Sequence, residues 1–376
     1  MKLFRTQCTY KEMCNLLRVN HKFSISVRSL KRILQQLNVK RKNIIESPIE
    51  MTVMAIIQIV TSTSGFNLGY RSIWRKLKSE YHLSVKRDTV LKFLRLIDPQ
   101  GVEARSRYRL KRRQYSVRGP NYLWHVDGHD KLKPFGFAIH GCADGYSRKV
   151  IWLEVSTTNN KPEVIAHYYL KSLLEYGIPC AVRADKGTEN NLIEVIQIAL
   201  RYTDDDKRAK HNSFLRGKST ANERIEKWWK QQRNHTVEFY KRLFEEMEKS
   251  GALDSSNKVQ IECLRFCFGP ILKEDSKRCM KEWNEHRVRK QNDCKSPCGI
   301  PNVIYYWPEK YNGIKFEKNI DKEIILKLIN QFTIEPKLHH ERIEELIKML
   351  VPNIHTPRSH EEAKQLINIH INNNIA

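Results

Sequence analysis

The chain has 376 residues and carries 67 Lys and Arg against 42 Asp and Glu, a formal net charge of +25. This length exceeds what one hydrophobic core usually supports, so we expect two or three domains. The charge is beyond what solubility requires and predicts an acidic polymer, that is a nucleic acid, as partner, because each neutralised phosphate releases counterions. A ribosomal-type or merely basic surface is the alternative that charge alone leaves open.

Secreted and membrane proteins are disfavoured by the apolar pattern. No stretch near the N-terminus has the length of a signal peptide or membrane span, and the most apolar run, residues 53–60, predicts a buried helix. We therefore expect no membrane partner and reduced thiols at the nine cysteines. The pairs Cys263/Cys267 and Cys294/Cys298 lack the two-residue spacing of a strong zinc site, which leaves structural zinc as a minor alternative.

Residues 1–97 predict an all-α DNA-binding region built from two helix-turn-helix units. The first has a helix within residues 21–37, with Ser24 or Ser26 able to cap its start and an apolar stripe at positions 27, 30, 33, 34 and 37. Its other face carries Arg28, Lys31 and Arg32, as in a helix that packs by one face and contacts DNA by the other. Residues 69–77 and 84–95 repeat this pattern. A helical bundle with a charged outer face is the alternative.

Residues 98–120 predict a basic linker. Between positions 105 and 118 there is no acid, and two tyrosines are interleaved with the cations, which favours contact with phosphates. The linker cations expected to bind DNA are Arg105, Arg107, Arg109, Lys111, Arg112 and Arg113. The last three also form a weak nuclear-import pattern, and we expect a nuclear protein.

From residue 121 the pattern changes to short apolar runs at 122–126, 135–143, 149–155 and 180–184. Asp144-Gly145 indicates a hairpin between the second and third runs, and a helix from Pro162 to Gly177 separates the third from the fourth. This order predicts an α/β core over residues 121–308, with a mixed sheet flanked by helices. Residues 309–376 predict a mostly helical C-terminal tail, with helices around 324–329 and 342–350 and a frayed end from 369.

Acidic residues follow two of the predicted strands. Asp127 ends the first strand and Asp185 ends the fourth, so adjacent parallel strands would bring both carboxylates to one edge of the sheet. In residues 219–230, Thr220 and Glu223 have the spacing of a capping box, and we interpret Glu226, one turn further on, as the third site carboxylate. Three clustered carboxylates repel one another unless cations neutralise them, and their oxygens suit two Mg²⁺ or Mn²⁺ ions that promote phosphodiester cleavage and joining.

Four other titratable residues lie near this edge. We interpret Asp144 as a hairpin-turn residue and Asp130 as a loop residue rather than as metal ligands. His125 and His129 flank Asp127; proton transfer by either is conceivable, but a structural or phosphate-contacting role is favoured.

These motifs together resemble the integrase core domain, the RNase H-like fold shared by retroviral integrases and many DDE transposases. The resemblance covers about residues 118–308 and runs through 122–128, 143–152, 185–190 and 222–229. It implies that Asp127, Asp185 and Glu226 are the catalytic and metal-binding triad of a polynucleotidyl transferase. The gap between Asp185 and Glu226 is somewhat long for the family, and residues 283–289 resemble the end of the module in transposon-derived animal proteins.

The sequence thus predicts a DNA integrase or transposase that acts as a homo-oligomer on double-stranded DNA without a small-molecule cofactor. Lys227 and Lys230, beside Glu226, complete the cations expected to contact DNA. The main alternative is a domesticated transposon-derived DNA-binding protein without catalytic activity. Ribonuclease H proper explains the fold but leaves the two helix-turn-helix units without a role.

Overall fold

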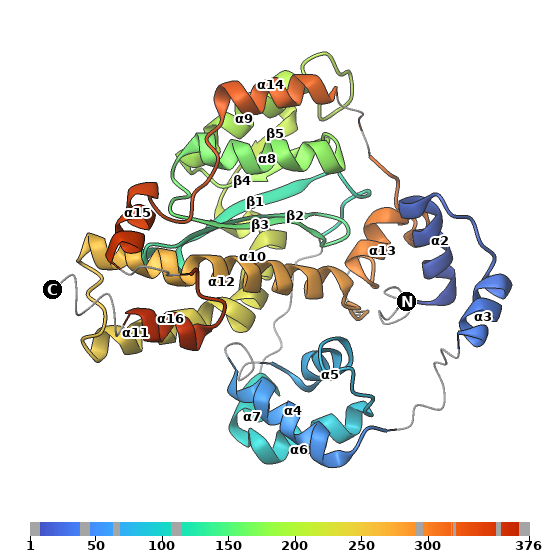
Figure 1. The fold of residues 1–376 in the computed structure, drawn as a ribbon. Helices are drawn as coiled ribbons and strands as arrows, with labels where there is room; N and C mark the ends of the chain where they lie inside the picture. Colours follow the sequence, from blue (N-terminus) through green and yellow to red (C-terminus); the bar gives the residue numbers. More distant parts are fainter. Residues whose placement is uncertain are drawn as a thin grey trace. The chain divides into compact units, whose positions relative to one another are not determined.

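The computed structural model describes residues 8–37, 46–62, 68–106, 115–290, 296–316, 318, 321–350 and 355–367. They fall into two compact units, one within Met1–Tyr115 and Glu285–Trp307 and the other within Ser116–Asn284 and Pro308–Ala376 (Figure 1). No helix among these residues is both long and apolar enough to cross a bilayer.

The described residues of the first unit are mainly helical, with one isolated β-bridge between Val288 and Gly299. Its helices are α2 (Tyr10–His21), α3 (Val27–Gln36), α4 (Ile49–Thr61), α5 (Tyr70–Ser79), α6 (Arg87–Ile97), α7 (Pro99–Ser106) and α13 (Pro301–Tyr306). Helix α3 begins as expected after Ser26, whose Oγ accepts a 3.0 Å hydrogen bond from the backbone N–H of Ser29. Of the predicted apolar stripe, Leu30 and Leu34 are buried, whereas Ile33 and Leu37 are 38% and 59% exposed. The stripe therefore supplies a narrower packing face than the sequence suggested.

Helices α4, α5 and α6 share a separate hydrophobic cluster. Ile56 of α4 packs with Ile73 and Leu77 of α5 and with Val90 and Leu94 of α6. The predicted buried helix at 53–60 and the second predicted helix pair, α5 and α6, are thus present. Their packing against a third helix explains why one face of each is apolar.

Residues 285–307 belong to the first compact unit, although the sequence grouped them with the core. Helix α13 packs against α2, and Arg287 forms a 3.1 Å ion pair with the buried carboxylate of Glu12. Glu12 also closes a capping box with Thr9 at the start of α2. A buried carboxylate requires such partners. The ion pair therefore holds the segment at residues 285–307 against α2.

The second unit is built on a five-stranded sheet with the order β3-β2-β1-β4-β5. The strands are β1 (Trp124–His129), β2 (Ala138–Asp144), β3 (Val150–Ser156), β4 (Val182–Ala184) and β5 (Phe214–Arg216). Strand β2 is antiparallel to β1 and β3, whereas β4 is parallel to β1 and β5. This mixed sheet with flanking helices confirms the RNase H-like α/β fold. Strand β5 was not predicted, because its three residues are too few to show an alternating pattern.

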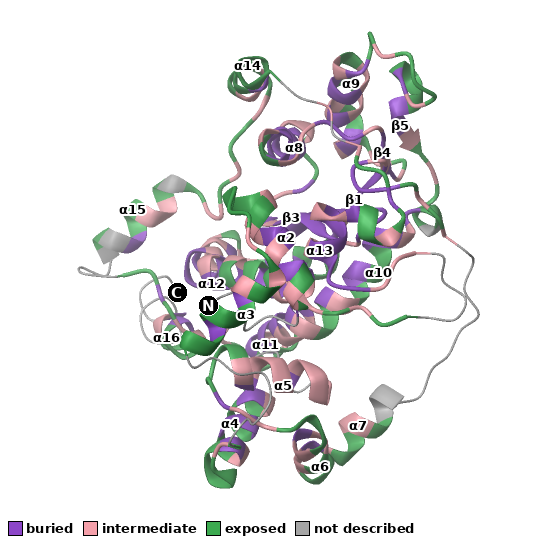
Figure 2. Cartoon of the chain, turned by 90° about the vertical axis from the view of Figure 1, so that its right-hand side faces the viewer, coloured by how far each residue is buried: buried purple, intermediate pink, exposed green. Residues whose placement is uncertain are grey.

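Helices cover both faces of the sheet (Figures 1 and 2). On one side lie α8 (Pro162–Tyr176), α9 (Asn191–Leu200) and α14 (Lys322–Phe332), and on the other lie α10 (Glu223–Gln232), α11 (Glu238–Lys249) and α12 (Lys258–Glu285). Helix α8 begins at Pro162, and Gly177 caps its end with a φ of 73°, both as predicted. Between α10 and α11 the chain forms one π-helical segment, η6 (Arg233–Val237).

Short 3₁₀ segments and two further helices complete the unit. The 3₁₀ segments are η2 (Asp130–Phe135), η3 (Thr188–Asn190), η4 (Lys210–Ser213), η5 (Ser219–Ala221) and η7 (Pro308–Tyr311), and the helices are α15 (Glu341–Leu350) and α16 (His360–Leu366). Helices were expected at α14 and α15. The predicted frayed end from residue 369 lies outside the described residues.

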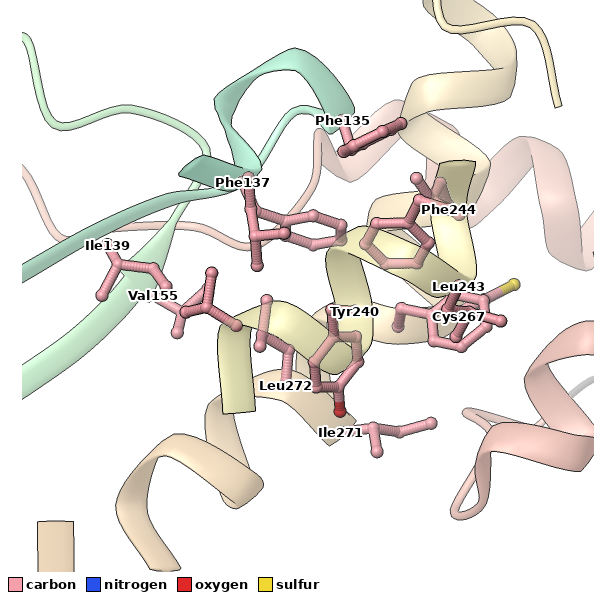
Figure 3. Close-up of a cluster of buried hydrophobic side chains, with 14 of the residues drawn as sticks. Phe135, Phe137, Ile139, Val155, Tyr240, Leu243, Phe244, Cys267, Ile271 and Leu272 are labelled. Atoms are coloured by element: carbon pink, nitrogen blue, oxygen red, sulfur yellow. The ribbon is translucent and has the colours of Figure 1, made fainter. Parts of the chain in front are cut away.

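The largest core lies between the sheet and α10 to α12 (Figure 3). Phe137, the residue before β2, stacks on Phe244 of α11 with ring centroids 5.7 Å apart, and Leu272 of α12 is fully buried beside them. Ile347 and Ile367 from the C-terminal residues join the same cluster. The segment that the sequence set apart as a tail therefore completes the core.

The end of α12 is fastened to the sheet by side chains of the motif at 283–289. Trp283 Nε1 donates a 2.7 Å hydrogen bond to the carbonyl of Arg148. The amide of Asn284 bonds to both the backbone N–H and the carbonyl of Val150, at 2.8 and 2.9 Å. These bonds occupy backbone groups at the start of β3 and so fix the long helix in place.

We predict that Gly141→Ala destabilises the second unit by about 1–3 kcal/mol, because overpacking in a close-packed core costs this much. Gly141 lies opposite Asp127 in the sheet, and an added Cβ would lie 2.8 Å from the Trp229 ring and 3.5 Å from Ile225 Cδ1. Chemical denaturation would measure the change. Gly217→Ala is the matched control, since a Cβ there meets only Ala221, at 3.8 Å. Equal stability of the two variants would contradict the close approach.

Candidate active site

Two carboxylates lie at the same edge of the sheet. The parallel pairing of β1 and β4 aligns Trp124 with Val182 and His125 with Arg183. Asp127 and Asp185 each lie two residues beyond the last of these pairs, so the register places them side by side. Asp185 follows the end of β4 as expected, whereas Asp127 does not end its strand, because the pairing of β1 with β2 continues to His129. The predicted parallel neighbours are therefore present.

Helix α10 is tied to β1 by a fully buried asparagine. Asn222 immediately precedes the helix, and its Nδ2 donates to the carbonyl of Val126 at 2.7 Å. Its Oδ1 lies 2.7 Å from Nδ1 of His125. Because Asn222 is 1% exposed, these bonds satisfy an amide that would otherwise be costly to bury. They fix the start of α10 beside the strand that carries Asp127.

Two more bonds fix the direction of α10. Arg224 Nε donates to the carbonyl of Gly145 at 2.8 Å, in the turn between β2 and β3. Trp229 Nε1 donates to Oδ2 of Asp127, also at 2.8 Å. Glu226 lies four residues after Asn222 and three before Trp229, the spacings that share one helix face. Its position on the helix therefore directs it toward the carboxyl edge of the sheet.

The predicted capping box is wrong. Helix α10 begins at Glu223, so Asn222 is the N-cap and Glu223 is the first helical residue instead of the third. Thr220 lies earlier, in η5. Glu223 instead forms a 2.8 Å ion pair with Lys227, one turn along. The interpretation of Glu226 as the site carboxylate thus depends on its shared face with Asn222 and Trp229, not on capping.

Burial, with the charge of neighbouring acids, raises the pKa values of Asp127 and Glu226. Burial raises the pKa of Asp127 to about 7, the hydrogen bond from Trp229 opposes this rise, and the charges of Glu226 and Asp185 add to it. Burial and the charge of Asp185 also raise the pKa of Glu226. Asp127 therefore holds its proton more firmly than an ordinary aspartate, as expected where like charges gather without a cation.

A further carboxylate, Glu189, was not identified from the sequence. Burial raises its pKa, and the charges of Asp185 and Asp130 raise it further. Asn190 Nδ2 donates to Glu189 Oε1 at 3.0 Å and lies 3.4 Å from Asp185 Oδ1. The only sequence signal was its position four residues after Asp185, which is also common in surface turns.

The other two acids near the site, Asp144 and Asp130, are bonded to local partners. Asp144 ends β2, and its Oδ2 accepts bonds from the backbone N–H groups of Tyr146 and Ser147, as a turn residue does. Asp130 begins η2 and forms a 3.0 Å ion pair with Lys133 and a 2.7 Å hydrogen bond with Asn159. Both carboxylates are thus occupied by local partners.

The two histidines are uncharged at neutral pH. Burial lowers the pKa of His125 to about 3 and that of His129 to about 4. His125 is bonded to Asn222, and the His129 ring lies 5.0 Å from that of Trp229. Both rings therefore serve the packing of β1 against α10.

The donor set fits a divalent cation in its chemistry. Carboxylate oxygens are the ligands that Mg²⁺ and Mn²⁺ prefer, and a bound cation would relieve the repulsion that raises the pKa of Asp127. Asp127 and Asp185 are half-buried, whereas Glu226 is exposed. Within the described ranges, no group of three His, Cys, Asp or Glu side chains stands close enough to share one ion.

A known family model matches the α/β part of the chain together with residues 285–303 of the first unit. Residues 114–303, half of the chain, match the model described as the integrase core domain. The chain belongs to the integrase core domain family. DNA integration and transposition are therefore its broad functional class.

One solved structure similar to this integrase-family chain is the cryoEM structure of a simian T-cell lymphotropic virus intasome in complex with the PP2A regulatory subunit B56 gamma. The identity is 11%, over 69% of this chain and 79% of that chain, with a TM-score of 0.34. The comparison with curated proteins gives no match.

The cations expected to bind DNA lie in several parts of this integrase-family chain. Lys227 and Lys230 are exposed on α10. Arg28, Lys31 and Arg32 are exposed on α3, with Lys31 also 5.3 Å from the ring centroid of Tyr10. Arg105 lies in α7. The remaining linker cations, Arg107, Arg109, Lys111, Arg112 and Arg113, lie outside the described residues.

We predict that Asp127→Asn stabilises the metal-free protein at pH 7.5 but not at pH 4.5. The folded-state pKa of about 7 lies above the ordinary value of 3.8, so the folded protein binds this proton more tightly. As the pH rises from about 4 to 7, ionisation of Asp127 therefore lowers the free energy of unfolding. Asparagine does not ionise, so the variant does not lose this stability. If solvent screening halves the difference between the folded and unfolded pKa values of Asp127, the gain in the free energy of unfolding is about 2 kcal/mol.

Denaturant titrations in chelator at the two pH values would measure this gain. Asp130→Asn is the control of opposite sign, because hydrogen bonds from Asn159 and Lys133 outweigh the effect of burial and lower the pKa of Asp130. That variant should lose stability at pH 7.5. An Asp127→Asn gain equal at both pH values would contradict the raised pKa of Asp127.

Proposed function

We propose that this protein is a DDE-type integrase or transposase that cleaves and joins DNA strands. Asp127, Asp185 and Glu226 are its catalytic and metal-binding carboxylates. The observation that carries the proposal is the placement of these three acids: the pairing of β1 with β4 brings Asp127 and Asp185 together, and the bonds of Asn222 and Trp229 hold the helix that carries Glu226 against β1. Like charges brought together weaken a fold, so a purely structural role offers no reason for the arrangement.

The chain's own residues hold the reacting groups in place. Asp127 in β1 and Asp185 just after β4 are held side by side by the pairing of these strands, and the bonds of Asn222, Arg224 and Trp229 orient the helix that carries Glu226. Asp127, Asp185 and Glu226 would hold two Mg²⁺ or Mn²⁺ ions, which would supply activation of the attacking oxygen and stabilisation of the leaving oxygen in an in-line phosphoryl transfer. His125 and His129 are neutral in the working pH range, so neither is proposed to transfer a proton.

The exposed cations serve DNA binding in this proposal. Lys227 and Lys230 follow Glu226 on α10 and suit contact with the backbone beside the cleaved phosphate. The cations of α3 and of the linker add contacts further along the duplex. We also propose assembly as a homo-oligomer on DNA and a nuclear location.

Glu226→Gln is expected to reduce DNA cleavage and strand transfer by at least about 100-fold, because a metal ligand is lost. Asp185→Asn should have the same effect. Glu223→Gln should remain active and lose about 0.3–0.5 kcal/mol of stability, the usual contribution of an exposed helical ion pair. Cleavage of labelled DNA in Mg²⁺ or Mn²⁺, with a chelator control and melting curves, would measure both effects.

An inactive Glu223→Gln protein of unchanged stability, beside an active Glu226→Gln protein, would show that the wrong glutamate has been assigned. A wild-type protein that binds DNA but cleaves none in Mg²⁺ or Mn²⁺ would favour the domesticated DNA-binding alternative. Cleavage in excess chelator would refute the metal-dependent mechanism.

Replacing Arg28, Lys31 and Arg32 together by alanine should weaken binding to duplex DNA and flatten its salt dependence. Loss of three phosphate contacts reduces the slope of log K against log salt by roughly 2 to 3. Gel-shift titrations of the full chain at several salt concentrations would measure this slope. The control replaces three exposed lysines of α11 and α12, namely Lys249, Lys258 and Lys277. An equal loss of DNA affinity in both triple variants would show that the effect comes from the lower net charge and not from contacts made by α3.

A further inference from the structure

Trp228 and Trp229 are adjacent in α10, and both are buried, at 1% and 4% exposure. The Trp229 indole N–H donates to Asp127 Oδ2 at 2.8 Å. The Trp228 indole N–H is buried and has no hydrogen-bond partner among the described residues. Trp228 packs instead on Trp283, with ring centroids 5.2 Å apart. Of the two tryptophans, Trp229 contacts a carboxylate of the site and Trp228 does not.

The approach of Trp229 to Asp127 is built into the sheet. Its ring crosses β2 at Gly141, the residue paired with Asp127, where an added Cβ would lie 2.8 Å from the ring. The ring also lies 5.0 Å from that of His129, two residues beyond Asp127. With these neighbours on β1 and β2, the indole has little freedom to turn, and its N–H direction is set by packing.

An indole N–H is a hydrogen-bond donor only. It can neither coordinate a cation nor accept a proton, so its effect on Asp127 is limited to orienting the carboxylate and favouring its charged form. One lone pair of Oδ2 is engaged by this bond, and the rest of the carboxylate stays available to ligands. This is how partners behind a metal ligand usually act.

We propose that Trp229 is a positioning residue that holds the Asp127 carboxylate in the orientation in which it binds the catalytic metal ions. The inference rests on the proposed function, since it assumes that Asp127 is a metal ligand. Trp229 and Glu226 share a face of α10, so the same bond also links the position of the helix to that of Asp127. Asp127 and Glu226 are thereby brought to the site together.

The first test measures Mn²⁺ binding by calorimetry in four full-length proteins: wild type, Trp229→Phe, Trp228→Phe and Asp185→Asn. Phenylalanine keeps most of the apolar packing and removes the N–H. Trp229→Phe should weaken Mn²⁺ binding by about 10–100-fold, the usual effect of losing a partner behind a metal ligand. Trp228→Phe should leave the affinity unchanged. Melting curves would establish that both variants fold.

The second test needs no tryptophan variant and no metal. The indole N–H resonances of the wild-type protein, labelled with ¹⁵N at tryptophan, are compared with those of Asp127→Asn. The resonance of Trp229 should shift, and that of Trp228 should not. An unmoved Trp229 resonance would overturn the contact itself.

The outcomes separate this inference from the proposed function. Normal Mn²⁺ affinity in Trp229→Phe, with reduced affinity in Asp185→Asn, would overturn the role of Trp229 and leave the metal site standing. Equal losses in both tryptophan variants would assign the effect to packing and also overturn it. A wild-type protein that takes up no Mn²⁺ would refute the metal site and this inference with it.

Discussion

The parallel pairing of β1 with β4 is the constraint on which the candidate site depends. Two strands from distant parts of the sequence run side by side in one register, so Asp127 within β1 and Asp185 just after β4 lie next to each other. This places negative charges together in a half-buried setting, which weakens the metal-free fold. The surrounding bonds of Asn222, Arg224 and Trp229 counter that tendency by fastening α10 across the strand that bears Asp127.

Much of this could be predicted from the sequence, because the information was local. Four strands follow from short apolar runs. The hairpin at Asp144 follows from a turn residue, and the helix from Pro162 to Gly177 follows from residues that favour a helix start and a helix end. The prediction that Asp127 and Asp185 lie close together followed from their positions directly after two such apolar runs.

What could not be predicted involves contacts between distant residues. The four residues from Thr220 to Glu223 fit a capping box, but Asn222 bonds to His125 and Val126 instead, and α10 starts two residues later than expected. Trp228 and Trp229 look alike in sequence, and only the position of Asp127 distinguishes them. Burial of Glu12 likewise depends on Arg287, 275 residues away, so no local pattern reveals it.

The C-terminal residues have a consequence for the order of folding. Ile347, Ala363 and Ile367 belong to the same hydrophobic cluster as Phe137 and Phe244, and His360 lies 2.9 Å from the hydroxyl of Tyr240. During synthesis the strands and α10 to α12 emerge well before these residues do, and domains generally fold as units. The core therefore stays partly uncovered on the ribosome until residue 367 has been made. A message cut short before that point would yield a protein with every proposed catalytic residue and an unfinished interior, which would make it a substrate for chaperones and proteases.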